Sequence, residues 1–153
     1  MTPEEFIEWL APSAVAQCKP YNLPPSVVIA QAALESGWGN YTIGEYNLFG
    51  RKAVADDHYI IVQTEECYNG NWVTIEDAFK LYGSLLEAID DWCILITQEP
   101  AYLPAWGIWC ATGDVEQFVY AIGPVYATDP EYAQKVMATI RANDLLQYDS
   151  EVV

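Results

Sequence analysis

The hydrophobic pattern predicts helices at the start of this chain. Apolar side chains recur at helical spacing through residues 6–14, behind a capping box in which Thr2 and Glu5 cap each other. A second helix is predicted from about Pro25 to Ser36, with Gly37 in the position that ends it. Almost every face of this second helix is apolar, which is typical of a helix buried at the centre of a domain.

A β-hairpin is predicted in the middle of the chain. Two runs alternate between apolar and polar residues, at about 59–68 and 71–75. The Asn69-Gly70 pair between them is the strongest short signal for a hairpin turn. The stretch before the hairpin, residues 37–50, is rich in glycine and asparagine and is predicted to be a loop.

The second half of the chain returns to helical signals. Ser84 and Glu87 form a capping box ahead of a helix that reaches about residue 97. Asp114 starts a further helix to about residue 122, and Asp129, followed by proline, is predicted as the N-cap of a last helix to about residue 142. Residues 100–113 contain prolines and glycines and are predicted to form an aromatic-rich loop or short helical turns.

These elements predict one mainly helical α+β domain with a small β-hairpin inserted. No internal repeat, low-complexity segment or linker interrupts the 153 residues, a length at which a single domain is common. The domain is therefore predicted to span residues 1–153, with a core at about 3–148 and a C-terminal tail at 149–153.

The charge of the chain excludes several partners. It has 22 acidic against 6 basic side chains, a formal net charge of −16, so neither nucleic acid nor an anionic lipid surface is expected to bind. No apolar run is long enough for a membrane span. The acidic N-terminus does not fit a signal peptide, so synthesis in the cytoplasm is predicted.

Histidine and cysteine limit the possible chemistry further. His58 is the one histidine, so a zinc site built on two or three histidines is impossible, and its polar surroundings favour a solvated turn. The four cysteines, Cys18, Cys67, Cys93 and Cys110, show no Cys-x-x-Cys spacing. They are predicted to be mostly buried small hydrophobes, and the three disulfide pairings that four cysteines allow stay open.

Glu35 is the strongest candidate for chemistry. It is the one ionisable side chain in residues 23–40, and it lies at the C-terminal end of the predicted buried helix, close to Trp38. Burial and the negative end of the helix dipole both raise the pKa of a carboxyl group. A carboxylic acid that stays protonated near neutral pH is what a glycosidase needs to protonate a leaving oxygen, while the alternative is an ordinary helix-end glutamate in solvent.

Three motifs follow one another along the chain. They are Gln31–Gly39 (QAALESGWG), Tyr46–Lys52 (YNLFGRK) and Tyr126–Lys135 (YATDPEYAQK). In this order they closely resemble glycoside hydrolase family 73, the peptidoglycan endo-β-N-acetylglucosaminidases, over nearly the whole chain. The resemblance implies a lysozyme-like fold in which the β-hairpin forms one wall of a sugar-binding groove.

The resemblance also implies the site residues. Glu35 matches the catalytic acid of the family, and Thr64-Glu65-Glu66 matches its Thr-x-Glu context, which assigns the second acid to Glu66, with Glu65 as the alternative one register step away. Tyr126 matches a tyrosine that lies in the groove near the acid. The residues implied as substrate contacts are Trp38, Tyr41, Tyr46, Asn47, Phe49 and Tyr132. Each of these six has core packing as its alternative.

The sequence therefore predicts a peptidoglycan hydrolase that cuts β-1,4 bonds of the glycan strand, most favourably as an endo-β-N-acetylglucosaminidase. A muramidase or lytic transglycosylase on the same fold and a non-catalytic glycan-binding or assembly module stay open as alternatives. No metal or organic cofactor is implied, and a monomer is expected. The setting is predicted to be the cell wall or periplasm, as a phage lysin or virion-associated enzyme, with an exported bacterial enzyme as the alternative.

The net charge adds one more expectation. Peptidoglycan and its attached polymers are largely anionic, so this protein should be repelled by its substrate at long range. Moderate salt screens such repulsion, and activity is therefore expected to rise with it. The opposite response would indicate a positive field at the groove, for which Arg51 and Lys52 are the candidates.

Overall fold

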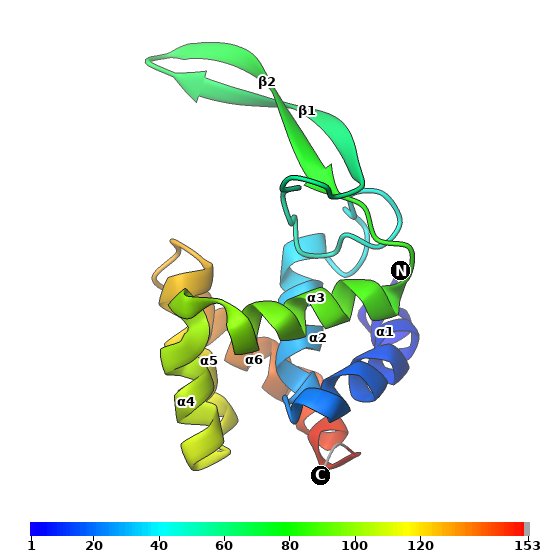
Figure 1. The fold of residues 1–153 in the computed structure, drawn as a ribbon, viewed down its shortest axis with the longest axis vertical. Coiled ribbons are helices and arrows are strands. Elements are labelled where there is room, and N and C mark those ends of the chain that lie inside the picture. The colour runs from blue at the N-terminus through cyan, green and yellow to red at the C-terminus, as the bar shows by residue number, and fades with distance from the viewer. Residues whose placement is uncertain (152–153) are drawn as a thin grey trace.

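The computed structural model describes residues 1–151, without the side chains of Glu66 and Glu151. Its helices pack together, and a two-stranded hairpin projects from them (Figure 1). The helices are α1 (Pro3–Cys18), α2 (Pro25–Ser36), α3 (Leu85–Gln98), α4 (Leu103–Thr112), α5 (Val115–Tyr126) and α6 (Tyr132–Ala142), with the 3₁₀ turns η1 (Lys19–Tyr21), η2 (Pro100–Tyr102) and η3 (Leu145–Glu151). The strands are β1 (Tyr59–Tyr68) and β2 (Asn71–Lys80). The predicted mainly helical, lysozyme-like fold is confirmed.

Helix α2 runs through the centre of the helical part (Figure 1). Its residues from Pro25 to Ala33 are all buried, and α1, α6 and η3 pack around it. Gly37 ends the helix in the left-handed conformation, with a φ of 56°, which glycine adopts without steric cost. The predicted bounds and the central burial of this helix are confirmed.

The hairpin is longer than predicted. Strand β1 pairs with β2 in antiparallel register from Tyr59↔Lys80 to Tyr68↔Asn71. Asn69 and Gly70 both have positive φ angles, as the predicted hairpin turn requires. The prediction that the second strand ends near residue 75 is wrong, because Glu76 and Asp77 break the sequence alternation but still pair with β1.

The foot of the hairpin is tied to the loop before it. Lys80 and Ala78, near the end of β2, form backbone hydrogen bonds with Arg51 and Ala53, each 2.9 Å long. The Asn47 side-chain amide donates to the carbonyl oxygens of Arg51 and Lys80, and its oxygen accepts from the Arg51 N–H. Asn47 is 2% exposed, so these bonds are shielded from water.

The C-terminal half differs from the prediction in three places. Most of the segment predicted as a loop or short turns forms the ten-residue helix α4. Helix α5 continues past residue 122 to Tyr126 and includes Pro124, whose fixed φ is compatible with a helix although it cannot donate a backbone hydrogen bond. The last helix begins at Tyr132, so Asp129 as its N-cap is wrong; the Asp129 carboxylate instead accepts from the Glu131 N–H and from Lys135 Nζ.

Other predicted features are partly confirmed. Ser84 caps α3 by accepting from the Glu87 N–H, but the Glu87 carboxylate bonds to Gly83 rather than back to Ser84. The four cysteines are free: Cys18 and Cys93 are buried with their Sγ atoms 4.0 Å apart, whereas Cys67 and Cys110 are exposed, so the prediction of mostly buried cysteines holds for half of them.

Asp149 anchors the predicted C-terminal tail. Its carboxylate accepts from the backbone N–H and the hydroxyl of Ser26, at 2.8 Å and 2.7 Å, at the start of α2. The described residues contain no helix that is both long and apolar enough to cross a membrane.

Candidate functional site

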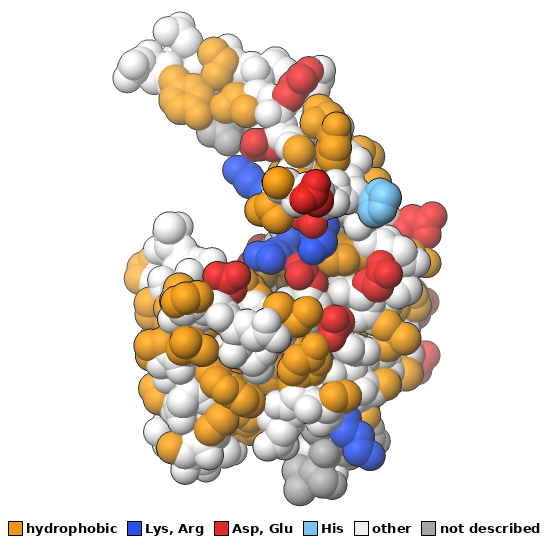
Figure 2. Space-filling view, viewed as in Figure 1, with side chains coloured by type: hydrophobic (Ala, Val, Ile, Leu, Met, Phe, Trp, Pro, Cys, Tyr) orange, Lys and Arg blue, Asp and Glu red, His pale blue; other side chains and the backbone are white. Residues whose placement is uncertain are grey.

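The candidate site lies where the end of α2, the end of α5 and the start of α6 meet. Glu35 comes from the last turn of α2, Tyr126 is the last residue of α5, and Tyr132 is the first residue of α6. The space-filling view is hollowed beneath the hairpin, between it and the helical body (Figure 2). A separate depression of about 570 Å³ lies along α1 and is lined by none of the predicted site residues.

Glu35 has the environment of a proton donor. One side of the residue is exposed, and burial of the other raises the pKa of its carboxyl group, while a hydrogen bond from Tyr132 lowers it. Burial outweighs the hydrogen bond, so the net shift is upward. The predicted direction of the pKa is therefore confirmed. Trp38, predicted as a substrate contact, packs edge-on against Phe6, with ring centroids 5.8 Å apart.

A series of hydrogen bonds that runs from Trp92 through Gln31 to Tyr132 determines where the Tyr132 hydroxyl hydrogen points. The Trp92 indole N–H donates to Gln31 Oε1 at 2.8 Å, and Gln31 Nε2 donates to the Tyr132 oxygen at 3.3 Å. An indole nitrogen only donates, so the Gln31 amide is oriented, and the Tyr132 oxygen becomes an acceptor. The Tyr132 hydrogen is therefore left for the Glu35 carboxylate.

Tyr126 and Tyr132 form a stacked pair beside this acid. Their ring centroids are 5.5 Å apart and their planes differ by 7°. Tyr126 keeps some exposed surface, yet protein atoms surround its hydroxyl, and this burial raises the pKa of the phenol well above its usual value, with Tyr132 and Glu35 adding to the shift. Tyr126 is therefore a neutral hydrogen-bonding group next to Glu35.

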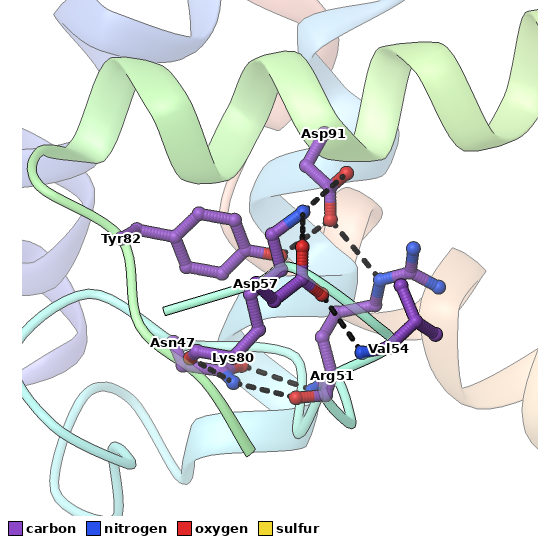
Figure 3. Close-up of polar contacts among 7 residues, drawn as sticks. All are labelled: Asn47, Arg51, Val54, Asp57, Lys80, Tyr82 and Asp91. Carbon is purple, nitrogen blue, oxygen red and sulfur yellow. Dashed lines mark hydrogen bonds and ion pairs between the residues drawn. The ribbon is translucent and has the colours of Figure 1, made fainter. Parts of the chain in front are cut away.

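A charged cluster joins the foot of the hairpin to α3 (Figure 3). The Asp91 carboxylate accepts from Arg51 Nε at 3.1 Å, from Lys80 Nζ at 3.4 Å and from the Tyr82 hydroxyl at 2.5 Å. Burial alone would raise the pKa of Asp91, but the Tyr82 hydrogen bond and the two cations outweigh it and lower the pKa. Lys80 also pairs with Asp57 at 3.6 Å. The loop before the hairpin and the strand at its end thus share one carboxylate.

The two candidates for the second acid lie on β1. Position 66 pairs with Val73, and the side chain of Glu66 lies outside the described part of the structure. Glu65 is exposed and pairs with Thr74. Successive residues of a strand alternate between its two faces, so position 65 lies on the opposite face from position 66. The choice between them stays a prediction.

The other predicted substrate contacts lie in different environments. Tyr41 is 81% exposed, and its ring packs over Gly37 at the end of α2. Tyr46 is half-buried. Asn47 and Phe49 are buried. The Asn47 side chain forms the hydrogen bonds at the foot of the hairpin, and Phe49 is part of the core. The structure thus gives Asn47 and Phe49 a supporting position behind the surface.

Sequence reasoning missed two groups of supporting residues. Gln31 lies four residues before Glu35, on the same face of a largely apolar helix, and a buried polar side chain in that position is a usable signal. Asp91 and Trp92 carried no such signal, because they lie in an ordinary amphipathic helix far along the chain.

Comparisons with known proteins point to one family. A family model described as Glucosaminidase, mannosyl-glycoprotein endo-beta-N-acetylglucosaminidase, matches residues 11–145. The chain is 35% identical over 154 residues to a probable N-acetylmuramidase of Lactococcus lactis subsp. cremoris, and 34% identical over 152 residues to the exo-glucosaminidase LytG of Bacillus subtilis. These alignments cover 95% and 94% of this chain but 35% and 52% of those proteins, so the chain spans about a third to a half of their length.

A solved structure gives the same result. The catalytic domain of the autolysin Auto from Listeria monocytogenes superposes with a TM-score of 0.84 at 33% sequence identity. The match covers 95% of this chain and 86% of that domain.

Proposed function

Because the chain belongs to the glucosaminidase family, glycoside hydrolase family 73, as its motifs implied, we propose that it hydrolyses β-1,4-glycosidic bonds in the glycan strand of peptidoglycan. The favoured activity is that of an endo-β-N-acetylglucosaminidase. The observation that carries the proposal is Glu35, a carboxyl group with a raised pKa in the last turn of the buried helix α2. The C-terminal end of that helix lies below the projecting hairpin (Figure 1).

In this proposal Glu35 is the general acid. Its carboxyl proton moves to the glycosidic oxygen as the bond to the anomeric carbon breaks, and the positive charge that develops on the sugar ring needs a stabilising group. Glu66 or the 2-acetamido group of the substrate fills that role, and a water molecule then adds its hydroxide to the anomeric carbon. The remaining proton of that water passes to the Glu66 carboxylate in the first case and to the Glu35 carboxylate in the second. Tyr126 lies near the acid as a neutral phenol and is suited to hydrogen-bond the acetamido group or the water.

The test is the Glu35→Gln variant on purified sacculi. Removing a general acid lowers the rate by a factor of about 10² to 10⁴, so lysis, followed as loss of turbidity, should fall to background. Undiminished lysis by this variant would sink the assignment of Glu35 as the general acid, whereas a wild-type protein that binds sacculi without lysing them would leave the non-catalytic module as the explanation. A folding control is thermal unfolding followed by circular dichroism.

The raised pKa of Glu35 also predicts how the Glu35→Gln substitution changes stability. A carboxyl with a raised folded-state pKa stabilises the protein below its unfolded pKa, and this contribution is lost as pH rises through the folded value. Glu35→Gln removes the penalty of holding a partly buried charge, so at neutral pH it should be at least as stable as the wild type. The difference in stability between the variant and the wild type should become smaller at acidic pH.

A muramidase is the second candidate, because a relative with 35% identity is named a probable N-acetylmuramidase. Mass spectrometry of the digested muropeptides separates the possibilities. Reducing-end glucosamine indicates the favoured cut, reducing-end muramic acid a muramidase, and anhydro-muramic acid a transglycosylase. The predicted monomer and the phage or bacterial setting stay predictions.

A further inference from the structure

Cationic side chains gather at the foot of the hairpin although the chain as a whole is strongly anionic. Arg51, Lys52 and Lys80 are half of the six basic residues, in a protein with a net charge of −16. Figure 2 shows blue side chains beneath the hairpin, facing the hollow. Lys52 pairs with Asp77 at 3.4 Å, and Lys80 is shared between Asp57 and Asp91. Each of these two lysines therefore pairs with a carboxylate of the foot through a single flexible ammonium group.

Arg51 is held differently from the two lysines. Its backbone is fixed by Asn47 and Lys80, its Nε donates to Asp91, and its guanidinium also interacts with the Tyr82 hydroxyl. The two terminal nitrogens of the guanidinium point away from the Asp91 carboxylate (Figure 3), and the side chain is 38% exposed. Asp91 divides its charge among Arg51, Lys80 and Tyr82, so it neutralises Arg51 only in part. Arg51 thus presents a fixed, forked donor pair.

The Arg51 side chain also lies next to the proposed reaction centre. It lines one narrow gap of about 10 Å³ together with Phe49, Asp91 and Tyr126. Its positive charge acts on the Tyr126 phenol, the same phenol on which the Glu35 charge acts. A ligand that reaches Glu35 and Tyr126 therefore lies within the field of Arg51.

We propose that Arg51 is a specificity-determining residue that binds a carboxylate on the muramoyl side of the substrate. The proposal rests on the glycan hydrolase function proposed above. N-acetylglucosamine is neutral, whereas muramic acid carries a lactyl carboxyl group, which is free in denuded glycan and amide-linked to the stem peptide in intact peptidoglycan. The stem peptide supplies carboxylates of its own. A planar guanidinium matches either carboxylate through two parallel hydrogen bonds.

The test measures binding of three ligands, two of which are a matched acid and amide pair. The protein carries Glu35→Gln, so that the ligands are not cut. The ligands are the denuded tetrasaccharide of alternating N-acetylglucosamine and N-acetylmuramic acid, the same tetrasaccharide with its lactyl groups converted to carboxamides, and the tetrasaccharide with its L-alanyl-D-isoglutamate stems attached. Dissociation constants come from isothermal titration calorimetry.

With Arg51 intact, the acid tetrasaccharide should bind about tenfold more tightly than the amide, which is about 1.4 kcal/mol. In Arg51→Gln this preference should disappear while the amide binds unchanged, and Arg51→Lys should keep part of it because a point charge replaces the fork. Lys19→Gln, which removes the same charge from η1, is the matched control and should keep the full preference. Preference for the stem-bearing ligand over the amide, with equal affinities for acid and amide, would assign the carboxylate to the peptide rather than to the lactyl group.

Three outcomes would overturn the proposal. With Arg51 intact, equal affinities for acid, amide and stem-bearing ligands would exclude carboxylate recognition without the need for a variant to fold. A preference for the carboxylate ligands that survives Arg51→Gln would assign it to another residue. An equal loss for all ligands would make Arg51 a structural partner of Asp91. Failure of every ligand to bind, in a protein that also leaves sacculi intact without the Glu35→Gln change, would instead refute the proposed function itself.

Discussion

The two walls of the candidate site are built in opposite ways. The helical wall, which carries Glu35, Tyr126 and Tyr132, rests on buried side chains and on the hydrogen-bonded chain through Gln31 to Trp92. The hairpin wall exposes most of its side chains, including Trp72 at 70% and Tyr59 at 58%. A two-stranded hairpin is at best marginally stable alone, so this wall depends on its attachment at the foot.

The difference shows which part of the site is held most firmly in position. The proposed role of Glu35 as proton donor requires that it be held within a fraction of an ångström of its target, and the end of a buried helix is suited to that. A wall that admits and releases a polymer chain can be less rigid, provided that its base is fixed. The foot cluster around Asp91 and Asn47 is therefore the part of the hairpin on which function should depend most.

The largest effect should come from removing the shared carboxylate. Asp91→Ala leaves Arg51 and Lys80 without their common partner, and the loss of unfolding free energy should be about 2 kcal/mol, less than for a fully buried pair because both cations are partly exposed. Activity on sacculi should fall further than the folded fraction does, because the hairpin loses its tie to α3. Urea unfolding and lysis assays measure the two effects.

Asp77→Ala is the matched control for that experiment. It removes one carboxylate from the exposed pair with Lys52 and should cost no more than about 0.5 kcal/mol. If both variants lose stability equally, the foot is not anchored through Asp91, and the contrast between the two walls fails.

A pair of glycine substitutions compares the walls at equal backbone strain. Gly37, at the end of α2, and Gly70, at the hairpin tip, both have positive φ, where alanine costs about 1–2 kcal/mol. At Gly37 the added Cβ would also lie 2.7 Å from the Tyr41 ring, whereas at Gly70 it meets open space. Gly37→Ala should therefore lower both the melting temperature and the activity, since it distorts the helix end that holds Glu35.

Gly70→Ala should leave the melting temperature of the helical body unchanged, because strain at the tip is confined to the hairpin. Near-ultraviolet and far-ultraviolet circular dichroism distinguish the response of the helical body expected for Gly37→Ala from the response confined to the hairpin expected for Gly70→Ala. A loss of activity in Gly70→Ala as large as in Gly37→Ala would show that the tip takes part in binding the glycan.

The same contrast explains how much of the molecule the sequence could predict. Helix α2, its glycine stop and the Asn69-Gly70 turn follow from local patterns, and the structure confirms them. The length of β2 could not be predicted, because Glu76 and Asp77 look like turn residues until β1 pairs with them. The candidate acid was visible because a lone charge stands beside a buried helix. Its supporting contacts to Tyr132, Gln31 and Trp92 join α2 to α6 and α3, and only the fold brings these together.

A smaller effect tests the chain of hydrogen bonds behind Glu35. Tyr132→Phe removes the hydroxyl that stabilises the charged carboxylate, so the pKa of Glu35 should rise. A general acid works in its protonated form, and its activity is lost as pH rises through that pKa. The alkaline limb of the pH–rate profile should therefore move to higher pH, with the maximal rate changed by about tenfold or less. Gln31→Leu should shift the limb in the same direction by less, because the hydroxyl remains; a shift to lower pH in either variant would refute this direction of bonding.

The smallest effect is the response to salt, which concerns both walls at once. If the net charge of −16 repels an anionic glycan, activity should rise by a factor of about two to five between low and moderate ionic strength. Two charge-removing variants show which wall causes the repulsion: Glu76→Gln on the exposed hairpin, and Glu4→Gln in the first turn of α1. Equal weakening of the salt response assigns the repulsion to the net charge, whereas weakening by Glu76→Gln alone assigns it to the hairpin wall. Activity that falls with salt in the wild type, and no longer does so in Arg51→Gln, would mean that contact with Arg51 outweighs the long-range field.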